Sequence, residues 1–144
     1  MLTGSLVAAL LAGCATTSMA APENTQPLVT PEATFVVFQK AWRLGDVDTL
    51  LKIYAAGRLD GLIKQLQEQG REAVTQWYQR DAHAWEFKNP RWNREARWLA
   101  YLTVSLSPRT NTAPATNTTR EVNISFAWVR GGWRITTMRT HEGP

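Results

Sequence analysis

The sequence predicts an α+β fold in which N-terminal helices cover one face of an antiparallel sheet. Apolar residues recur at helical spacing between residues 31 and 80, and they alternate with polar residues from residue 85 onward. A Gly-Gly pair inside the alternating half marks a tight hairpin between antiparallel strands. Because helices and strands occupy separate stretches of the chain, the pattern favours α+β over repeated β-α-β units.

The first helix is expected over residues 31–44. Thr30 suits the N-cap, Pro31 suits the first helical position, and Glu32 places a negative charge in the first turn. Gly45 is suited to end the helix, because glycine accepts the left-handed conformation of a C-cap.

Three further helices are expected over residues 46–57, 59–70 and 72–80, each bounded by a glycine or a capping aspartate. Their apolar residues fall three or four positions apart, which places them on the core side of each helix. These residues are Val47, Leu50, Leu51 and Tyr54 in the second helix, Leu59, Leu62, Ile63 and Leu66 in the third, and Val74, Trp77 and Tyr78 in the fourth.

The second half of the chain is expected to form strands. Trp85 and Phe87 indicate a short first strand, and residues 98–106 indicate a longer second one. The last hairpin is expected to turn at Gly131-Gly132, which sets Trp128 opposite Ile135. The alternation predicts a shared buried face formed by Trp98, Phe126, Trp128 and Ile135.

Residues 1–14 contain an uncharged apolar run that ends in Leu11-Ala12-Gly13-Cys14. This segment resembles the signal peptide of a bacterial lipoprotein, because it fills every position of the lipobox pattern. A run of about 10 apolar residues is too short to span a bilayer but suits a signal peptide. The resemblance implies cleavage after residue 13 and acylation of Cys14. The run lacks the preceding Lys or Arg of a typical signal peptide, which leaves open a start upstream of Met1.

Residues 14–30 are expected to tether the acylated cysteine to a single domain over residues 31–144. The residues of the tether are mostly small or polar, and prolines interrupt it. Ala15 follows the cysteine where an aspartate is associated with inner-membrane retention, so the resemblance implies the outer membrane, facing the periplasm. The alternative is an apolar N-terminal helix with a free thiol. Cys14 is the only cysteine, which excludes a disulfide within the chain.

The composition is that of a globular protein, with 44% hydrophobic and 19% charged residues. The positive excess lies in residues 80–144, which hold ten basic and five acidic side chains. In the envelope, such a surface favours lipid headgroups or an acidic protein partner over nucleic acid. A solvated polar face is the plainer alternative. The sequence sets no expectation for the oligomeric state.

The Gly-Asp junction at residues 45–46 leads into Leu50-Leu51 and Tyr54, and the end of the chain carries a Phe126-to-Ile135 hairpin with a Gly-Gly pair. These two segments resemble NTF2-like domains. The resemblance covers about residues 31–140 and implies a curved sheet that wraps around the helices as a cone, often with a pocket at its mouth. NTF2-like proteins include isomerases, dehydratases and binding domains, so the fold leaves function to the site.

The expected pocket wall carries no group that transfers protons. Its aromatic lining is predicted to be Trp85, Phe87, Trp98, Phe126 and Trp128. The alternative of an isomerase- or dehydratase-like enzyme requires a base, for which Asp81 and His83 are the candidates. Tyr54, Tyr78 or Tyr101 would be the donor that stabilises the developing oxyanion. Asp81 could equally end a helix, and His83 could be exposed.

A cationic segment rich in tryptophan supplies the candidate binding surface. Trp92 follows Pro90 and is expected in an exposed turn, where Trp and Arg often form binding hot spots. The surface is predicted to consist of Lys88, Arg91, Trp92, Arg94 and Arg97. In the alternative, Trp85 and Trp98 are core residues and the cations are solvated.

No metal site or cofactor is expected, because the sequence has two histidines, one cysteine and no phosphate-binding glycine motif. The sequence therefore favours a non-catalytic envelope lipoprotein. Its membrane contact would be the lipid anchor, and it would bind an apolar small molecule or a protein partner.

Overall fold

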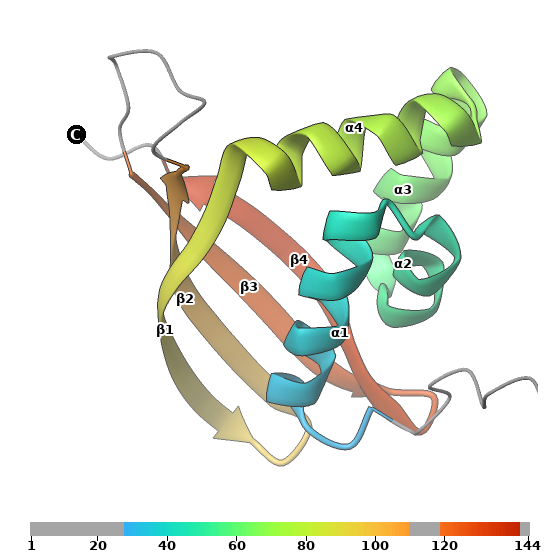
Figure 1. Cartoon of the computed structure of the whole chain (residues 1–144). Helices are drawn as coiled ribbons and strands as arrows, with labels where there is room; N and C mark the ends of the chain where they lie inside the picture. The colour runs from blue at the N-terminus through green and yellow to red at the C-terminus, as the bar shows by residue number, and fades with distance from the viewer. Residues whose placement is uncertain (1–27, 110–118, 142–144) are drawn as a thin grey trace, which may run out of the picture.

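The computed structural model describes residues 28–109 and 119–141, and its fold is a four-stranded antiparallel sheet with four helices on one face (Figure 1). The predicted α+β class is therefore confirmed. The lipobox, Cys14 and most of the expected tether lie outside the described residues. Within the described ranges, no helix has both the length and the apolar character needed to cross a membrane.

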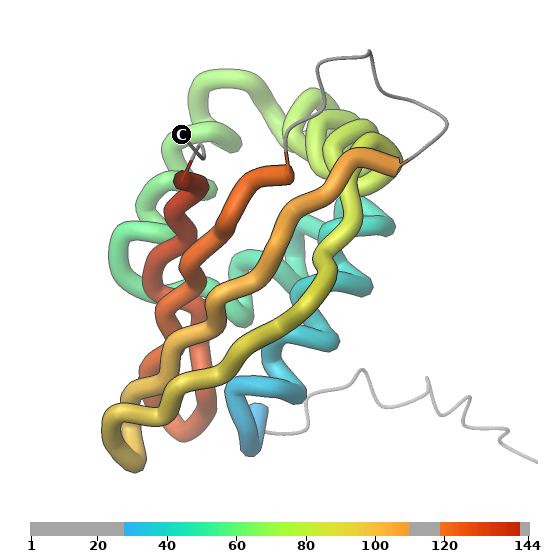
Figure 2. Tube along the Cα trace, turned by 90° about the vertical axis from the view of Figure 1, so that its left-hand side faces the viewer, coloured from blue at the N-terminus to red at the C-terminus, as the bar shows by residue number. Residues whose placement is uncertain are grey.

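Helix α1 (Pro31–Leu44) begins and ends as its sequence predicts. The Thr30 side chain accepts a hydrogen bond from the Ala33 N–H at 3.0 Å, and Gly45 takes the left-handed conformation with φ 64°. The helix lies in the concave side of the sheet and buries its apolar face there (Figure 2). Its buried apolar side chains are Phe35, Phe38, Ala41 and Trp42.

The remaining helices are α2 (Val47–Ile53), α3 (Ala56–Gln69) and α4 (Arg71–Ala84). The second helix ends at Ile53, earlier than the predicted Gly57. Tyr54 forms a parallel bridge with Ile135, and the Ala55 N–H donates to the Ile135 carbonyl at 2.9 Å. This pairing with the sheet redirects the chain before Gly57, which then lies inside α3.

The sheet consists of β1 (Trp85–Ala96), β2 (Leu99–Pro108), β3 (Arg120–Val129) and β4 (Gly132–His141), paired in that order. β1 is longer than predicted, and Pro90 lies within it rather than in a turn. The register shifts between Lys88 and Arg91, and Asn89 has φ 53°. A bulge in an edge strand tolerates proline because no N–H is needed there.

That bulge corrects the prediction for Trp92. Phe87 and Trp92 are five residues apart, yet both pack against the core on the concave side. The Trp92 ring lies 6.2 Å from Phe35 and 5.2 Å from Phe126. A regular strand would point residues an odd number apart to opposite faces, and the bulge removes that difference. Trp92 is therefore partly buried against the core, where an exposed turn was predicted.

The last hairpin turns one residue earlier than predicted. Arg130 and Gly131 have φ 52° and 76°, the positive values that a type I′ turn requires at both central positions. Trp128 pairs with Trp133, and Phe126 pairs with Ile135. The predicted register would have placed Arg130 opposite Trp133 on the apolar face, whereas the observed register moves this charge into the turn.

Two of the four residues predicted to form the buried face of the sheet are exposed. Phe126 and Ile135 have no exposed surface, but Trp98 is 60% exposed and Trp128 is 44% exposed. Trp98 lies in the turn before β2, and Trp128 lies on the concave face near the end of its strand. Alternation assigns a side chain to a face of the sheet, but burial also requires a helix to cover that position.

Candidate functional site

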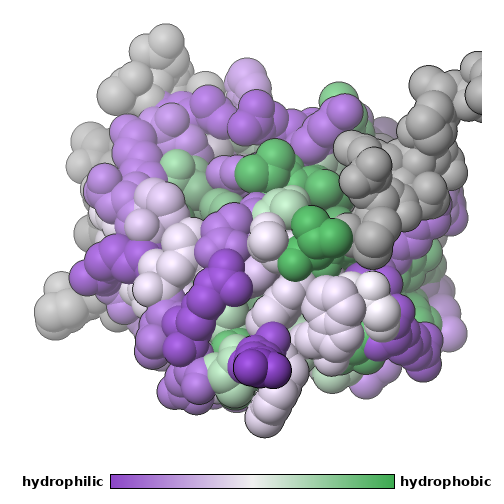
Figure 3. Space-filling view, turned by 90° about the horizontal axis from the view of Figure 1, so that it is seen from below, coloured by the Kyte–Doolittle hydropathy of each residue, from purple (hydrophilic) through white to green (hydrophobic). Residues whose placement is uncertain are grey.

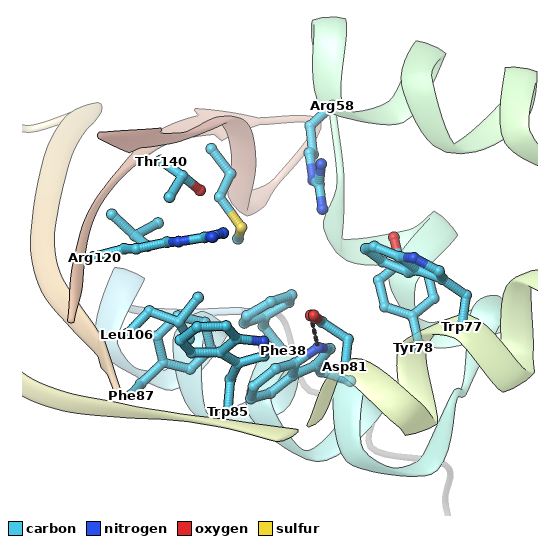
Figure 4. A pocket seen from close by; sticks show the side chains of 13 residues that line it. Phe38, Arg58, Trp77, Tyr78, Asp81, Trp85, Phe87, Leu106, Arg120 and Thr140 are labelled. Carbon is cyan, nitrogen blue, oxygen red and sulfur yellow. Dashed lines mark hydrogen bonds between the residues drawn. The ribbon is translucent and has the colours of Figure 1, made fainter. Parts of the chain in front are cut away.

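A cavity of about 230 Å³ opens where α4 leads into β1 (Figure 4). We call this end of the sheet the wide end of the cone, and the end with the β1–β2 and β3–β4 turns the narrow end. Helices α1, α3 and α4 and all four strands contribute to it. The lining residues are Phe38, Trp42, Arg58, Trp77, Tyr78, Asp81, Trp85, Phe87, Leu106, Arg120, Val122, Met138 and Thr140.

The floor of the pocket is aromatic. The rings of Trp42 and Phe87 lie 4.9 Å apart, and Phe38 stacks on Trp42 with ring centroids 6.3 Å apart. These rings come from α1 and β1, so the packing of α1 into the concave sheet creates the floor. A ligand placed there would meet flat apolar surfaces, which suit an aromatic or aliphatic body.

A bulge in the pairing of β3 with β4 directs the end of β4 into the pocket. The register between β3 and β4 shifts between Ser125 and Phe126, next to Thr136. Phe126 pairs with Ile135 on one side of the shift, whereas Ile124 pairs with Met138 on the other. Met138 and Thr140 therefore face the same side as Ile124, although their numbers differ from Ile135 by odd steps. Without this bulge both side chains would point away from the pocket.

Asp81 is a carboxylate inside this largely apolar space. The Trp42 indole Nε1 donates a hydrogen bond to Asp81 Oδ2 at 3.0 Å. Burial raises the pKa of Asp81 above its ordinary value of 3.8, although the Trp42 hydrogen bond and the charges of Arg58 and Arg120 oppose this shift. Because the folded-state pKa is raised, ionised Asp81 destabilises the fold near neutral pH, and the penalty disappears as the pH falls below 3.8. A carboxylate retained at such a cost marks a candidate site.

Arg58 faces Asp81 from the first turns of α3. Its Nη2 donates to the Tyr54 hydroxyl at 3.3 Å, and its Cζ lies 4.9 Å from the centre of that ring. Its Nε–H is buried and meets no acceptor among the described residues. An unsatisfied buried donor costs about 1–3 kcal/mol, so a ligand that supplies an acceptor here would be favoured.

Tyr78 and Arg120 complete the polar part of the pocket. Burial raises the pKa of Tyr78, so its phenol stays protonated and can donate a hydrogen bond. The Arg120 guanidinium lies over the Trp85 ring at 5.2 Å. Arg58 and Arg120 point into the space from different sides (Figure 4). With two arginines and one aspartate, the lining carries one net positive charge.

The predicted pocket residues are divided between the two ends of the molecule. Trp85 and Phe87 line the pocket. Phe126 is a fully buried core residue, and Trp98 and Trp128 lie at the opposite, narrow end, where they are exposed. The predicted residues divide in this way because the mouth of the pocket is formed by the starts of β1 and β3 and the ends of β2 and β4. Trp98 and Trp128 lie at the other ends of the strands.

The predicted pair of Asp81 and His83 does not form a site. Asp81 lines the pocket, whereas His83 is exposed beside a shallow surface depression formed with Gln76, Gln79 and Arg80. Residues two apart on a helix point to nearly opposite sides, so His83 cannot assist Asp81. Among residues 28–109 and 119–141, no three His, Cys, Asp or Glu side chains are grouped as metal ligands.

The predicted cationic surface lies along β1 rather than in a loop. Its cations are exposed, and three of them are paired: Lys88 with Glu86 at 2.7 Å, Arg91 with Glu121 at 3.1 Å, and Arg94 with Glu32 at 2.7 Å. Trp92 is packed against the core. Arg97 remains exposed next to Trp98, in the turn at the narrow end.

Arg58 and Arg120 were not predicted from the sequence. Arg120 had a usable signal, because it shares the parity of Val122, Ile124 and Phe126 and so belongs to the concave face. The sequence signal for Arg58 was weaker. Arg58 follows Tyr54 by four residues, a spacing that would bring the two side chains together within one helix. Its approach to that ring depends on the bridge between Tyr54 and Ile135, which local spacing does not reveal.

The chain's sequence matches no protein-family model and no curated protein. Its fold is similar to that of a SEC-C motif containing protein from Rhodopseudomonas palustris, with a TM-score of 0.55 and 17% identity over 82% of this chain and 84% of that chain. It is also similar to an NTF-2 like protein of unknown function from Shewanella oneidensis MR-1, with a TM-score of 0.52 and 13% identity over 78% of this chain and 100% of that one. The fold is therefore NTF2-like, and function rests on the site.

Proposed function

We propose that this protein is a lipid-anchored module of the cell envelope that binds a small apolar acid in the pocket without chemical change. The carrying observation is the buried Arg58 Nε–H, which has no acceptor among the described residues and belongs to a pocket that also has an aromatic floor. The anchor is supported by the lipobox pattern at residues 11–14. Outer-membrane attachment facing the periplasm follows from Ala15, on the same resemblance.

The size and charge of the pocket narrow the class of ligand. A water molecule occupies about 30 Å³ in the liquid, so a cavity of about 230 Å³ holds roughly eight groups of that size. This volume matches a single-ring acid and lies below the range of drug-sized pockets. The ring would rest on Trp42 and Phe87, and the carboxylate would approach Arg58 and Arg120.

The pocket assignment predicts that phenylacetate raises the thermal midpoint of the protein more than 2-phenylethanol does. The two compounds share a ring and differ mainly in the charged group. Arg58→Met should weaken phenylacetate binding about tenfold or more, because a hydrogen bond to a charged group contributes about 1.5–3 kcal/mol. Lys64→Met is the matched control, since Lys64 is exposed elsewhere on α3. Equal stabilisation by both compounds would contradict the assignment.

The anchor predicts that Cys14→Ser yields a soluble protein or an uncleaved precursor. Stable attachment requires two or more acyl chains, and all of them depend on this cysteine. Membrane fractionation and the intact mass of the detergent-extracted protein provide the measurement. Adding Ser18→Cys to Cys14→Ser is the control, because a thiol outside the lipobox should not restore attachment. A Cys14→Ser protein that is cleaved and still in the membrane would refute the anchor.

One observation favours a second candidate function, a proton-transfer enzyme. Asp81 has a raised pKa and lies in the pocket with Tyr78, the arrangement of a base with a hydrogen-bond donor. Asp81→Asn separates the two candidates, because the amide oxygen can still accept from Trp42. For a binding module, the variant should bind phenylacetate at least as tightly. For an enzyme, wild-type protein should exchange the α-protons of phenylacetone for deuterium, and Asp81→Asn should not.

A further inference from the structure

The narrow end of the cone carries two exposed tryptophans on adjacent turns. Trp98 lies in the β1–β2 turn and Trp128 lies just before the β3–β4 turn, and their exposed fractions are 60% and 44%. The Trp128 N–H donates to the Trp98 carbonyl at 2.9 Å, which fixes the two turns side by side. The Trp128 ring also meets Trp133 edge-on at 6.2 Å. The tryptophans are therefore held at the surface by the ends of paired strands.

Arginines flank these rings. Arg97 precedes Trp98, Arg130 occupies the β3–β4 turn, and both are exposed. We call Arg97, Trp98, Trp128 and Arg130 the tip patch. Apolar and near-neutral residues, green and white in Figure 3, occupy the middle of this end, with hydrophilic residues between and around them. Aromatic rings beside arginines match the interface of a bilayer, where indoles lie at the level of the headgroups and cations attract anionic lipids.

The N-terminal end of the described chain lies at this same end of the molecule. The Trp133 N–H donates to the Leu28 carbonyl at 2.9 Å, so the chain enters the domain beside the tip patch. From Cys14 to Leu28 the chain spans 14 residue steps, which reach at most about 50 Å when fully extended. A lipid on Cys14 would therefore keep the tip patch within about 50 Å of the membrane surface and let it reach the bilayer, whereas the pocket opens at the opposite end.

We propose that the tip patch docks on the anionic surface of the membrane that carries the anchor. The choice of membrane rests on the lipid anchor of the proposed function. Trp98 and Trp128 enter the headgroup layer, and Arg97 and Arg130 contact the anionic headgroups. This pose turns the pocket mouth away from the bilayer. A stable protein interface uses about 20–30 residues on each side, far more than the tip patch supplies, so a bilayer is the better match.

The test uses residues 15–144, which include every described element and lack both the signal peptide and Cys14. Binding is measured to vesicles of phosphatidylethanolamine and phosphatidylglycerol, with brominated acyl chains to quench tryptophans that enter the bilayer. Trp98→Ser with Trp128→Ser should reduce partitioning about tenfold. Arg97→Gln with Arg130→Asn should reduce it about 25-fold, since each arginine near an anionic surface contributes about a fivefold preference. Added salt should reduce the arginine contribution, because exposed charges are screened over about 10 Å at 0.1 M.

The matched control is Leu44→Ser with Arg43→Gln. Leu44 is 58% exposed at the end of α1, away from the tip patch, and Arg43 is the exposed cation beside it. This variant should bind the vesicles as the unaltered chain does. The proposal would be overturned if the control lost as much vesicle binding as the tip variants, or if neither tip variant lost any. It would also be overturned if the tip variants bound vesicles normally but, in cells, lost a chemical cross-link to an envelope protein. Because the tested chain lacks Cys14, failure of acylation in cells refutes the anchor without affecting this result.

Discussion

Phe126→Ala is expected to lower the free energy of unfolding by about 3–5 kcal/mol, the range for removing a fully buried phenylalanine. Phe126 has no exposed surface, and its ring lies 5.2 Å from Trp92. Its strand neighbours Ala100 and Ile135 are also fully buried. The residues around it belong to a paired sheet, so they cannot collapse into the space that the ring leaves. The loss is large against a domain stability of about 5–15 kcal/mol.

Trp128→Ala is the matched comparison, because Trp128 lies two residues further along β3 on the same face. It is the larger side chain but is 44% exposed, and it packs on Trp133 at the end of the sheet. We expect it to cost about 1 kcal/mol, near the centre of the distribution for point substitutions, because the ring is half exposed but still packs on Trp133. Urea unfolding of both variants provides the measurement. A Trp128→Ala loss equal to that of Phe126→Ala would mean that the narrow end is covered in solution.

That comparison also shows where sequence patterns stop being informative. Alternation along β3 predicts that Phe126 and Trp128 share a face, and the observed register agrees. It cannot predict how far α1 covers that face, because coverage depends on how a separate element packs. The same limit applies to Trp98, which has strand parity but lies in the turn before β2. An exposed tryptophan and a core tryptophan can therefore carry the same local pattern.

Helix boundaries were more predictable because local chemistry sets them. Thr30, Pro31 and Gly45 each act within a few residues of their own positions, and α1 begins and ends as they indicate. The end of α2 was predicted less well, because the bridge between Tyr54 and Ile135 joins residues that are far apart in the chain. The β1 bulge is similar, since a proline in a strand pattern suggests a turn unless the strand is known to be an edge.

The candidate site was predicted only in part, for a related reason. Asp81, Trp85 and Phe87 were identified because they lie at a helix-to-strand junction that the sequence makes visible. Arg58 and Arg120 approach them from α3 and β3, which are distant in the chain, and two bulges decide which side chains of β1 and β4 face inward. A pocket assembled from seven elements depends on register and curvature, and neither is a property of a short segment.

Gly45→Ala is expected to be the most destabilising glycine substitution in the described part of the chain. Gly45 has φ 64°, where an alanine costs about 1–2 kcal/mol. In addition, an added Cβ would lie 2.6 Å from the Thr75 carbonyl oxygen and 2.9 Å from Thr75 Cγ2. The carbonyl belongs to the backbone of α4, so the clash is relieved only by moving the helix. Overpacking of this kind typically costs a further 1–3 kcal/mol or so.

Gly131→Ala separates the two contributions. Gly131 has φ 76°, but an added Cβ there meets nothing within 4 Å, so this variant carries the backbone strain without the clash. We expect Gly45→Ala to lose about 2 kcal/mol more than Gly131→Ala in urea unfolding. Because α4 carries Tyr78 and Asp81, its displacement should also weaken phenylacetate binding, which Gly131→Ala should leave unchanged. If the two variants lost the same free energy of unfolding, α4 would be able to move away from Gly45 without an energetic cost. Its close approach to Gly45 would then not be needed to position the pocket residues.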